Sequence, residues 1–557
     1  MERETEISAV RYSFLANKIF HVLIILIIGT IAYSNTFHVP FHWDDLTYIG
    51  ENPIIKQFTF FIDPSAAKDF QFYNHFLQRY VTYLTFALNY ALHGYDVTGY
   101  HILNLIIHLL NALLVYFLVC LTFRTPVLET SAIRDKAELA ALFAASMFVS
   151  HPLQTMAVTY IYQRLASLVT LFYLISLISY IKSRQSLNTS YRTLFYCVSL
   201  LSAVIAMKSK ENAFTLPFTI AMFELFFFTG KIRERALKLI PFIFTLLIIP
   251  LFIIVSGGKD NIHPHINQSV TGDVYFFTQF RVLVMYLRLL FFPVHQTLLY
   301  DIPASRSFFE VKVVLSFLLL LGIFSLGVFL FIRSRIGRPE LRIIAFGIFW
   351  FFITHAVESS FIPILLAQEY RMYLPSIGLF MSISTGIFLL FQKSWFMRTA
   401  AFSMVIAIPL ILSVATYSRN TIWQSRLGLW EDVISKAPAS PEANFNLGFA
   451  YTEKGLIDKS EKYYKIAVKL NPDYARAYNN LGCVYGQKGN NDKAIELLLL
   501  ALSKKPNLAI AHYNLGLAYL LKGLPEKADT QLRTALKLNP DLQNAKRILT
   551  RIRQKRN

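Results

Sequence analysis

The sequence predicts an all-α protein, in which a polytopic bundle of membrane helices is followed by an α-solenoid of short repeats. Three observations predict this class. Of the 557 residues, 55% are hydrophobic and only 16% are charged, whereas a soluble domain carries about 25% charged residues. Residues 1–417 hold about eleven apolar stretches near the roughly 20 residues that a membrane-crossing helix needs. From residue 441 onward the sequence repeats every 34 residues.

The composition also excludes several classes of protein. Gly (22) and Pro (21) are too few, and apolar residues too many, for a disordered or collagen-like chain. Three cysteines are too few for a disulfide framework, and no cluster has zinc-ligand spacing. The net charge of +20 is compatible with nucleic-acid binding, but its distribution argues against it, because the positive charge follows the short loops of a membrane protein.

Eleven segments are predicted to cross the membrane. The predicted spans are 19–37, 99–123, 137–152, 157–181, 191–207, 212–229, 236–256, 311–331, 341–357, 371–391 and 397–417. The first span lacks a small-residue cleavage site, and we interpret it as a retained helix rather than a signal peptide.

The distribution of Lys and Arg predicts the orientation. With the N-terminus in the cytoplasm, the inner segments hold 19 of these residues, while the longer outer loops 38–98 and 257–310 hold about seven. This bias follows the positive-inside rule. The long loops and the C-terminus are therefore expected outside.

Two further apolar segments, 79–94 and 274–295, are predicted to be helices at the outer interface. The second carries Arg281 and Arg288 on one face, and a charge at the centre of a bilayer is costly. The alternative makes 274–295 a true span. That alternative would invert the membrane orientation of every later segment and place the basic loop 333–342 outside.

The 34-residue period is that of tetratricopeptide (TPR) repeats. The three full repeats are 441–474, 475–508 and 509–542, preceded by a half-repeat junction at 418–440 and followed by a basic capping tail at 543–557. Each full repeat has Leu-Gly, Tyr, Ala and Pro at matching positions, beginning with Leu447-Gly448, Leu481-Gly482 and Leu515-Gly516.

The repeat segment is basic, since residues 419–557 carry 23 Lys and Arg against 12 Asp and Glu. An outward-facing basic array indicates an acidic partner or anionic lipid headgroups. Solvated helix faces with a basic cap explain the charge equally well. Nucleic acid is not an expected partner outside the membrane.

Adjacent carboxylates, Asp44 and Asp45, follow the first span. Paired acids beside a membrane can act as a general base with an electrostatic partner. Either residue can instead cap a short helix, which composition alone favours.

Polar residues also gather within and at the outer ends of the spans. His101, Asn104, His108 and Asn111 share one face of the second span, where they either bond neighbouring helices or, for His101 near the outer end, reach a site. Four other clusters lie at outer ends: His151 with Gln154; Gln163 with Arg164; Lys208, Ser209, Lys210 and Glu211; and Gln368, Glu369, Tyr370 and Arg371. Cations at this depth suit a lipid-linked phosphate, although each is also explained by snorkelling or a local ion pair.

Six segments in series resemble a known family. They are WDD with the following ENP, TYLTFALNYALHGYDVTGYHILNLIIHLLNALL, FVSHPLQTMAVTYIYQR, KSKENAFTLP, QFRVLVMYLRLLFFPVHQTLLYDIP and EYRMYLPSIGLFM. In this order, and followed by TPRs, they resemble the transmembrane and TPR-containing O-mannosyltransferases and their bacterial relatives, which are GT-C glycosyltransferases and distant kin of the protein O-mannosyltransferases. The sequence departs from the family where Val81-Thr82-Tyr83 follows Arg79 in place of an Arg-Pro dipeptide, and in having three full repeats.

The resemblance implies a membrane glycosyltransferase. It would transfer a sugar, mannose in the family, from a polyprenyl-phosphate donor to a protein Ser or Thr hydroxyl on the extracytoplasmic side, with inversion. The localisation implied is the bacterial inner membrane, with membrane lipids around the bundle and the TPR array as the acceptor-binding part. No metal and no cofactor are expected, since kin with lipid-monophosphate donors generally need no metal and the acid pair lacks a spaced D-x-D.

The resemblance also assigns roles to residues. Asp44 and Asp45 would be catalytic, and the residues expected to bind the donor phosphate are Arg164, Lys208, Lys210 and Arg371. The supporting residues are His101, His151, Gln163, Glu211, Arg281, Arg288, Asp301 and Glu369.

Three alternatives remain. A transporter or lipid-linked glycan flippase would need polar groups through the full depth of the bundle, whereas these cluster on one side. A membrane-anchored TPR scaffold with an inactive core is a second alternative, and transfer to a lipid or glycan acceptor is a third.

Overall fold

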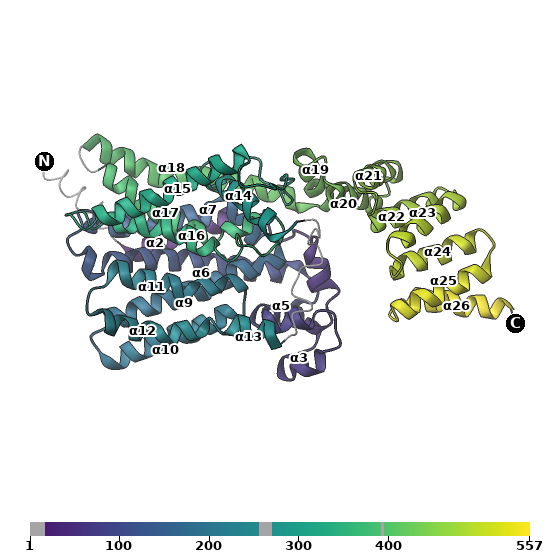
Figure 1. Cartoon of the computed structure of the whole chain (residues 1–557), viewed down its shortest axis with the longest axis horizontal. Helices are drawn as coiled ribbons and strands as arrows, with labels where there is room; N and C mark the ends of the chain where they lie inside the picture. The colour runs from purple at the N-terminus through teal and green to yellow at the C-terminus, as the bar shows by residue number, and fades with distance from the viewer. Residues whose placement is uncertain (1–16, 256–269, 392–394, 557) are drawn as a thin grey trace. The chain divides into compact units, whose positions relative to one another are not determined.

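The computed structural model describes residues 17–255, 270–391 and 395–556. Within these ranges the chain is helical and has no strand, which confirms the predicted all-α class (Figure 1). The chain divides into two compact units. We call Met1–Leu298 with Ile302–Gln424 the membrane unit, and Leu299–Asp301 with Ser425–Asn557 the repeat unit.

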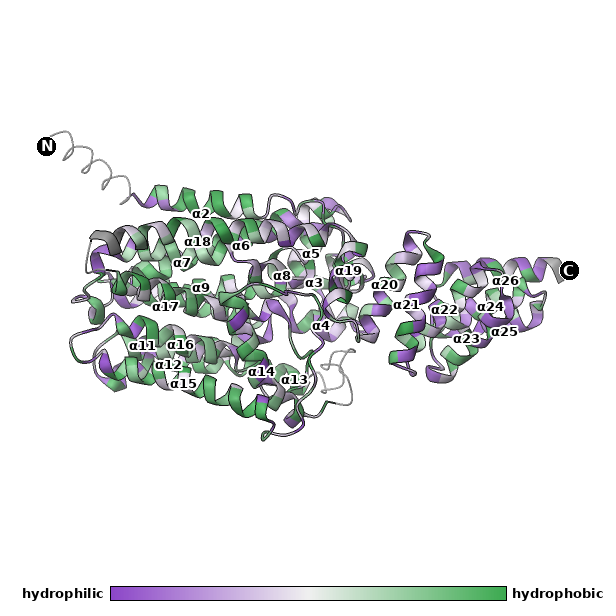
Figure 2. Ribbon diagram, turned by 90° about the horizontal axis from the view of Figure 1, so that it is seen from above, coloured by the Kyte–Doolittle hydropathy of each residue, from purple (hydrophilic) through white to green (hydrophobic). Residues whose placement is uncertain are grey.

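Apolar helices build the membrane unit, and Figure 2 shows them mostly in the green of hydrophobic residues. The longer helices are α2 (Lys18–Ala32), α5 (Tyr80–His93), α6 (Val97–Phe123), α7 (Ala137–Ser150), α9 (Arg164–Gln185), α10 (Thr189–Met207), α11 (Leu216–Phe227), α12 (Ile232–Thr245), α13 (Ile248–Val255), α14 (Gly272–Phe291), α15 (Val311–Arg333), α16 (Leu341–His355), α17 (Pro375–Leu390) and α18 (Trp395–Thr421). Three shorter helices are α3 (Thr59–Ile62), α4 (Tyr73–Gln78) and α8 (Thr155–Val158).

The predicted count of about eleven spans is not confirmed. Among the described residues, seven helices are long and apolar enough to cross a membrane, or eight if the bent pair 134–150 and 152–158 is one span. Three predicted spans form the shorter apolar helices α2, α16 and α17. A fourth, 212–229, begins with the 3-10 turn Glu211–Thr215, so that α11 has only 12 residues. The unit is nevertheless a multi-pass membrane bundle.

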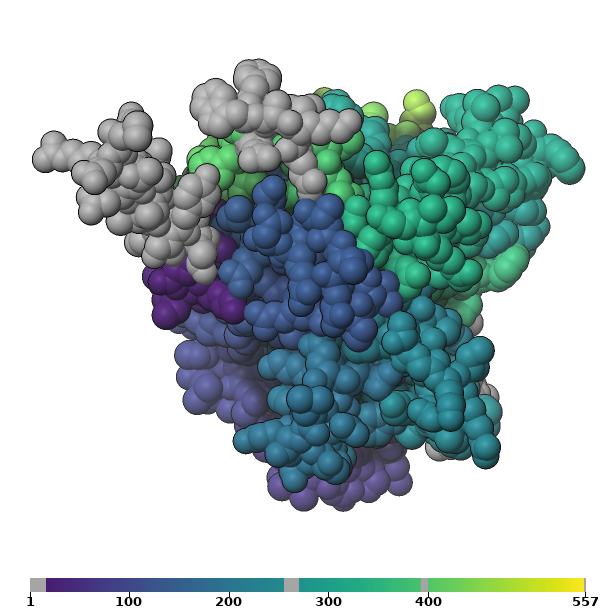
Figure 3. Space-filling model, turned by 90° about the vertical axis from the view of Figure 1, so that its left-hand side faces the viewer, coloured from purple at the N-terminus to yellow at the C-terminus, as the bar shows by residue number. Residues whose placement is uncertain are grey.

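At the end of the bundle where the short basic connections lie, a buried carboxylate joins three helices. Glu224 of α11 is fully buried and accepts hydrogen bonds from Arg184 of α9 at 2.9 Å and from Arg235 of α12 at 3.2 Å. A buried carboxylate is tolerated when it is paired in this way. Figure 3 looks onto this end, with the 124–136 connection in blue near its centre.

Helix α14 lies along the opposite end. The Tyr275 hydroxyl donates to the carbonyl of Glu358, just beyond α16, at 2.7 Å. Near the other end of α14, the carbonyl of Leu290 lies 2.9 Å from Nε2 of His151, just beyond α7. Both ends of this 20-residue helix therefore contact the same end of the bundle, which favours the interfacial placement over a crossing one, although its length and composition alone would allow a span.

The polar face of α6 binds neighbouring helices. Nδ1 of His108 lies 2.7 Å from the Tyr373 hydroxyl, and the Asn111 amide donates to the carbonyl of Ser167 at 2.8 Å. Nε2 of His101 lies 2.8 Å from the carbonyl of Val39. All three side chains are buried. The structure thus supports the interhelical alternative for this face.

The repeat unit contains one helix of the half-repeat, three pairs of helices and a capping helix. They are α19 (Arg426–Lys436), α20 (Pro441–Glu453), α21 (Ile457–Leu470), α22 (Ala475–Gln487), α23 (Asn491–Lys504), α24 (Ala509–Leu521), α25 (Pro525–Leu538) and the capping helix α26 (Gln543–Arg556). In each full repeat the glycine of the first helix faces the second helix: a Cβ on Gly448 would meet Tyr464 at 2.9 Å, and one on Gly516 would meet Leu532 at 2.8 Å. The missing side chain is what lets the paired helices approach.

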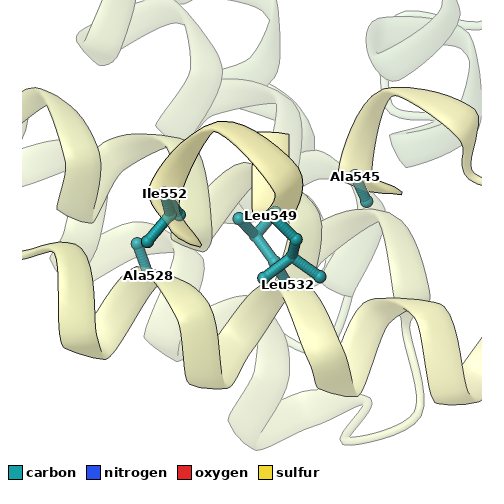
Figure 4. Packing of buried hydrophobic residues seen from close by; sticks show 5 residues of the cluster. All are labelled: Ala528, Leu532, Ala545, Leu549 and Ile552. Atoms are coloured by element: carbon teal, nitrogen blue, oxygen red, sulfur yellow. The ribbon is translucent and has the colours of Figure 1, made fainter. Parts of the chain in front are cut away.

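Helix α26 closes the array. Figure 4 shows its residues Ala545, Leu549 and Ile552 packed against Ala528 and Leu532 of α25, and all five are buried. An apolar stripe on a helix that is otherwise strongly basic covers the last repeat, as terminal repeats require.

Candidate functional site

A cavity of about 550 Å³ opens at the end of the membrane unit where α14 lies. Its polar lining comes from segments far apart in the sequence: Asp44, Arg79, Gln163, Lys210, Glu211, Glu358 and Arg371. Its apolar lining includes Phe214, Ile249, Ile253, Ile362 and Leu365. A lining that holds both charged and large apolar side chains suits a ligand with a polar head and an apolar tail.

The turn that carries the acid pair is closed by one of its two carboxylates. Oδ2 of Asp45 accepts the backbone N–H of His42 at 2.9 Å, and Oδ1 accepts the backbone N–H of Tyr162 at 2.6 Å. Trp43, between His42 and the acid pair, has a backbone φ of 37°, a strained conformation that bulky residues rarely adopt. Asp45 is buried, so the strained turn is held from inside and Asp44 is left on the cavity wall.

Asp44 is the half-buried member of the pair, and its backbone N–H donates to the Tyr160 hydroxyl at 2.9 Å. Burial raises the pKa of its carboxyl group to about 6, even though hydrogen bonding to Tyr160 and the positive charge of Arg79 lower it. A carboxyl group with a pKa near 6 is ionised at neutral pH and is a stronger base than an ordinary aspartate.

Arg79 forms the first of two ion pairs on the cavity wall. Its Nε lies 2.9 Å from Oε1 of Glu211, and its Nη1 donates to the Tyr162 hydroxyl at 3.3 Å. Burial raises the pKa of Glu211, but the charge and hydrogen bond of Arg79 outweigh burial and bring the pKa down to about 2. Glu211 is therefore ionised and neutralises Arg79.

Lys210 and Glu358 form the second pair. The Lys210 Nζ lies 2.5 Å from Oε1 of Glu358, and both side chains are buried. The same ammonium group lies 4.6 Å from the centre of the Tyr370 ring. The other carboxylate oxygen of Glu358 is buried and has no hydrogen-bond partner, so this pair has unused capacity for a ligand.

Arg371 differs from the other cations of the cavity. It is buried, and its guanidinium donates to the carbonyl of Leu365 at 2.6 Å and to the Tyr275 hydroxyl at 3.3 Å. Its Nε has no partner. Within the described ranges it forms no ion pair, and Glu369, the partner that a structural role would require, instead accepts hydrogen bonds from Gln296 and Thr297. Among the charged residues that line the cavity, Asp44 and Arg371 are thus the two that form no ion pair with another described residue.

Two predicted phosphate-binding residues lie outside this cavity. The Arg164 guanidinium donates to Asn104 at 2.5 Å and to the carbonyl of Tyr100 at 3.1 Å. Lys208 borders a separate apolar groove of about 300 Å³, where its ammonium group lies 5.3 Å from the centre of the Phe252 ring, and burial lowers its pKa. These hydrogen bonds give Arg164 a helix-joining role, and neither Arg164 nor Lys208 lines the cavity.

Some of the residues predicted to support the site line the cavity, and others lie outside it. Gln163 and Glu211 line the cavity. His101 and His151 bond backbone carbonyls, as described above, and Arg281 donates to the carbonyl of Pro303 at 2.8 Å. Arg288 is exposed on α14. Asp301 is exposed and belongs to the repeat unit.

Sequence reasoning missed several residues of the cavity. Arg79 stands out in the sequence only through a departure from the family pattern. Glu358 lies in an ordinary polar turn after a predicted span, so no sequence pattern indicates that it belongs to a site. Tyr162 stacks on Tyr48 with ring centres 4.4 Å apart, a contact between residues 114 positions apart. Among the described residues, no group of three or more His, Cys, Asp or Glu is arranged to hold a metal ion.

Comparisons with known proteins cover both units. Two TPR family models match the repeat unit: one, a TPR repeat, at residues 450–489 and 484–523, and one, the tetratricopeptide repeat, at residues 509–542. A protein O-mannosyl-transferase of Caenorhabditis elegans is 27% identical over 472 residues, which are 82% of this chain and 63% of that protein. Protein O-mannosyl-transferase TMTC3 of Homo sapiens is 25% identical over 500 residues, which are 81% of this chain and 51% of that protein.

The chain is a distant relative of the protein O-mannosyl-transferases. The predicted resemblance is therefore confirmed, and the repeats are TPRs. The chain spans between half and two thirds of the length of these relatives. Among solved structures, the crystal structure of MamA is 29% identical with a TM-score of 0.20, over 24% of this chain and 77% of that chain. The TPR protein YrrB is 20% identical with a TM-score of 0.22, over 27% of this chain and 78% of that chain.

Proposed function

We propose that this protein is an inverting glycosyltransferase, which moves a sugar from a polyprenyl-phosphate donor to a hydroxyl group on a protein. The observation that carries the proposal is that the base Asp44 and the cation Arg371, which form no ion pair within the described ranges, line one cavity and come from different segments of the chain. Inversion requires the base and the leaving phosphate to stand on opposite faces of the sugar. The names of the relatives support mannose as the sugar and protein as the acceptor.

In the proposed reaction Asp44 takes the proton of the acceptor hydroxyl as its oxygen attacks the anomeric carbon. The bond from this carbon to the phosphate oxygen breaks, and the phosphate leaves with the bonding electrons. Arg371 binds that phosphate through its planar guanidinium, because Arg–phosphate hydrogen bonds are charge-assisted. Lys210, paired with Glu358, lines the same cavity, and Asp45 positions Asp44 by holding the turn.

The apolar part of the cavity fits the lipid end of the donor. Ile249 and Ile253 come from α13, and Ile362 and Leu365 precede the Arg371 turn. A prenyl chain in contact with these residues leaves its phosphate beside Arg371 and Lys210. We place the cavity on the extracytoplasmic side of a bacterial inner membrane, with the TPR array selecting the acceptor.

The reaction is tested with the purified full chain in liposomes that contain polyprenyl-phosphate mannose, with a Ser- and Thr-containing peptide outside. Mass spectrometry is expected to find one hexose on a hydroxyl, and NMR the inverted anomeric configuration. Glycolipid or glycan products with an unmodified peptide would assign a different acceptor. No transfer by a folded protein that binds the donor would favour an inactive core that anchors a scaffold.

A further inference from the structure

The apolar groove beside Lys208 is formed by three segments of the membrane unit. They are the junction of α4 with α5, the end of α10, and α13 (Figure 1). The lining residues are Leu77, Tyr80, Val81, Val204, Ile205, Lys208 and Phe252. Among these seven residues, Lys208 alone carries a charge. We call this set the lysine groove.

The lysine groove is accessible from the surrounding bilayer. Leu201, one turn before Val204 on α10, is 62% exposed, and Ile254, near the end of α13, is 74% exposed. Val204 itself is partly exposed within the groove. Exposed apolar surface of this kind on a membrane bundle is covered by lipid. Lipid molecules of the bilayer can therefore enter the groove.

Along α10, the charged and apolar parts of the groove follow the order of a phospholipid. Lys208 caps the end of the helix, and its backbone N–H donates to the carbonyl of Val204 at 3.2 Å. Residues four apart on a helix share one face, and Val204 lies about 6 Å deeper in the span. A phosphate group on Lys208 is therefore at the membrane interface, and an acyl chain attached to it runs past Val204 toward the bilayer core.

The ammonium group of Lys208 lacks an acidic partner. Within the described ranges it forms no ion pair, and it lies 5.3 Å from the centre of the Phe252 ring. Burial lowers its pKa, as expected for a cation that no neighbouring negative charge compensates. Lys210, two residues further on, is instead paired with Glu358. A phosphate group would supply the charge that Lys208 lacks.

The end of α10 is also less negative than a free helix end. The carbonyl of Lys208 accepts the backbone N–H of Val81 at 3.1 Å, and the carbonyl of Ser209 accepts the Thr82 hydroxyl at 3.1 Å. Unpaired carbonyl groups at a helix end concentrate partial negative charge that disfavours an anion, and α5 satisfies these two. The same hydrogen bonds hold α5 against α10, so that these two walls of the groove are fixed without a ligand.

We propose that the lysine groove binds an anionic phospholipid of the surrounding bilayer, with an acyl chain against its apolar residues and the phosphate on Lys208. An anionic headgroup is favoured over a zwitterionic one, because Lys208 would repel the cationic group of the latter. The sugar donor is not the expected occupant, since Lys208 does not line the cavity that contains Asp44 and Arg371. This inference concerns lipid binding and does not rest on the proposed sugar transfer.

The groove and the cavity are built from the same segments. Residues that are neighbours in the sequence line one or the other: Tyr80 and Arg79, Lys208 and Lys210, and Phe252 and Ile253 line the groove and the cavity respectively. A lipid in the groove therefore contacts the segments that carry part of the cavity wall. Because the lipid binds the folded protein, it should also stabilise the membrane unit against unfolding.

The test measures lipid binding to the purified full chain by native mass spectrometry, with phosphatidylglycerol and phosphatidylcholine as the two probes. The wild type is expected to bind phosphatidylglycerol more tightly. Lys208→Gln, which removes the charge and keeps a long side chain, should weaken phosphatidylglycerol binding by about fivefold and leave phosphatidylcholine binding unchanged. Lys208→Arg should bind phosphatidylglycerol nearly as the wild type does. In nanodiscs, adding phosphatidylglycerol should raise the unfolding temperature of the wild type more than that of Lys208→Gln.

Two further variants sharpen the test. Lys312→Gln is the matched control, because Lys312 is an exposed lysine at the start of α15 and does not line the groove; it should bind both lipids as the wild type does. Val204→Trp should weaken binding of both lipids, because a larger side chain at this partly exposed position would fill the groove. Thermal unfolding in phosphatidylcholine checks that each variant is folded.

Equal phosphatidylglycerol binding by the wild type and a folded Lys208→Gln would overturn the proposal, since Lys208 would then only extend its ammonium group to the interface. Equal binding of the two lipids by the wild type would do the same. A third probe, polyprenyl phosphate, should bind Lys208→Gln as it binds the wild type. If it instead displaces phosphatidylglycerol and loses affinity in this variant, the groove belongs to the donor site and the proposal is wrong.

Discussion

The carboxylate of Asp45 accepts the backbone N–H of Tyr162 at 2.6 Å, across 117 positions of sequence. This hydrogen bond ties the first outer loop to the beginning of α9. It also separates two acids that are equivalent in the sequence, because Asp45 uses both carboxylate oxygens on backbone groups while Asp44 lines the cavity. Substitution of Asp44 and substitution of Asp45 should therefore affect activity and stability differently.

Asp44→Asn is expected to lower turnover by at least about 10²-fold with normal protein level and donor binding, because it removes the base and keeps the shape. Asp45→Asn replaces an acceptor of two N–H groups by an amide whose nitrogen cannot accept. It should lower the thermal unfolding temperature as well as activity. Transfer assays together with thermal unfolding in detergent separate the two outcomes. Near-normal turnover for Asp44→Asn would refute its role as the base.

The pKa of Asp44 predicts a pH profile for the transfer reaction. Its carboxyl group is raised to about 6 and must be ionised to accept a proton. Activity should therefore rise with pH through a midpoint near 6 and level off above it. Since the charge of Arg79 lowers this pKa, the double variant Arg79→Gln with Glu211→Gln, which removes both members of that ion pair, should move the midpoint upward.

The measurement for this prediction is the rate of transfer at low acceptor concentration between pH 4.5 and 8. Glu211→Gln alone is the control, since it leaves the positive charge of Arg79 and should move the midpoint down. A midpoint that stays fixed in both variants would assign the titration to another group.

Arg371→Ala is expected to weaken donor binding, because it removes the guanidinium that forms no ion pair within the described parts of the chain. Arg371→Lys should restore binding only in part. The planar guanidinium group, which can form two parallel hydrogen bonds to a phosphate, is replaced by a compact ammonium group. Binding of polyprenyl phosphate alone, measured in nanodiscs, is the readout. If both variants bind the donor normally while the protein unfolds more easily, the residue serves the hydrogen bond to Leu365 and the fold instead.

The packing of α16 against α17 predicts a strong effect at a glycine. A Cβ on Gly347 would lie 2.0 Å from the carbonyl oxygen of Gly378, which is backbone and cannot move away. Gly347→Ala should therefore destabilise the membrane unit by about 1–3 kcal/mol or more. Gly322→Ala in α15 is the matched control, because a Cβ there meets nothing within 4 Å and Ala favours the helix. Thermal unfolding followed by tryptophan fluorescence compares the two; equal stability would contradict the close approach of the helices.

The sequence predicted the parts of this structure that rest on periodicity. The repeats were recognisable because each contact recurs: Gly448 faces Tyr464 as Gly516 faces Leu532. The cavity was predicted only in part. Asp44, Lys210 and Arg371 were found from their place at the outer ends of apolar segments, but Arg79 and Glu211 pair across 132 positions, and no local pattern marks such a contact.

The membrane unit and the repeat unit are expected to have separate roles in the proposed reaction. The repeat-signature residues are Leu, Gly, Tyr, Ala and Pro, none of which is a plausible acid or base for the reaction. The six charged cavity residues all belong to the membrane unit. Deleting residues 425–557 should therefore leave donor binding and slow hydrolysis of the donor by water, because the internal contacts of the membrane unit remain.

The same deletion should abolish transfer to a protein acceptor while leaving transfer to a short soluble hydroxyl acceptor at high concentration, because only selection of the large acceptor depends on the TPRs. Mass spectrometry of the protein product and donor-binding measurements on the truncated protein check both parts. The fold control is the thermal unfolding of the truncated protein. Unchanged transfer to protein would reduce the array to a scaffold for other partners, and loss of donor binding by a folded truncated protein would place part of the donor site in the repeat unit.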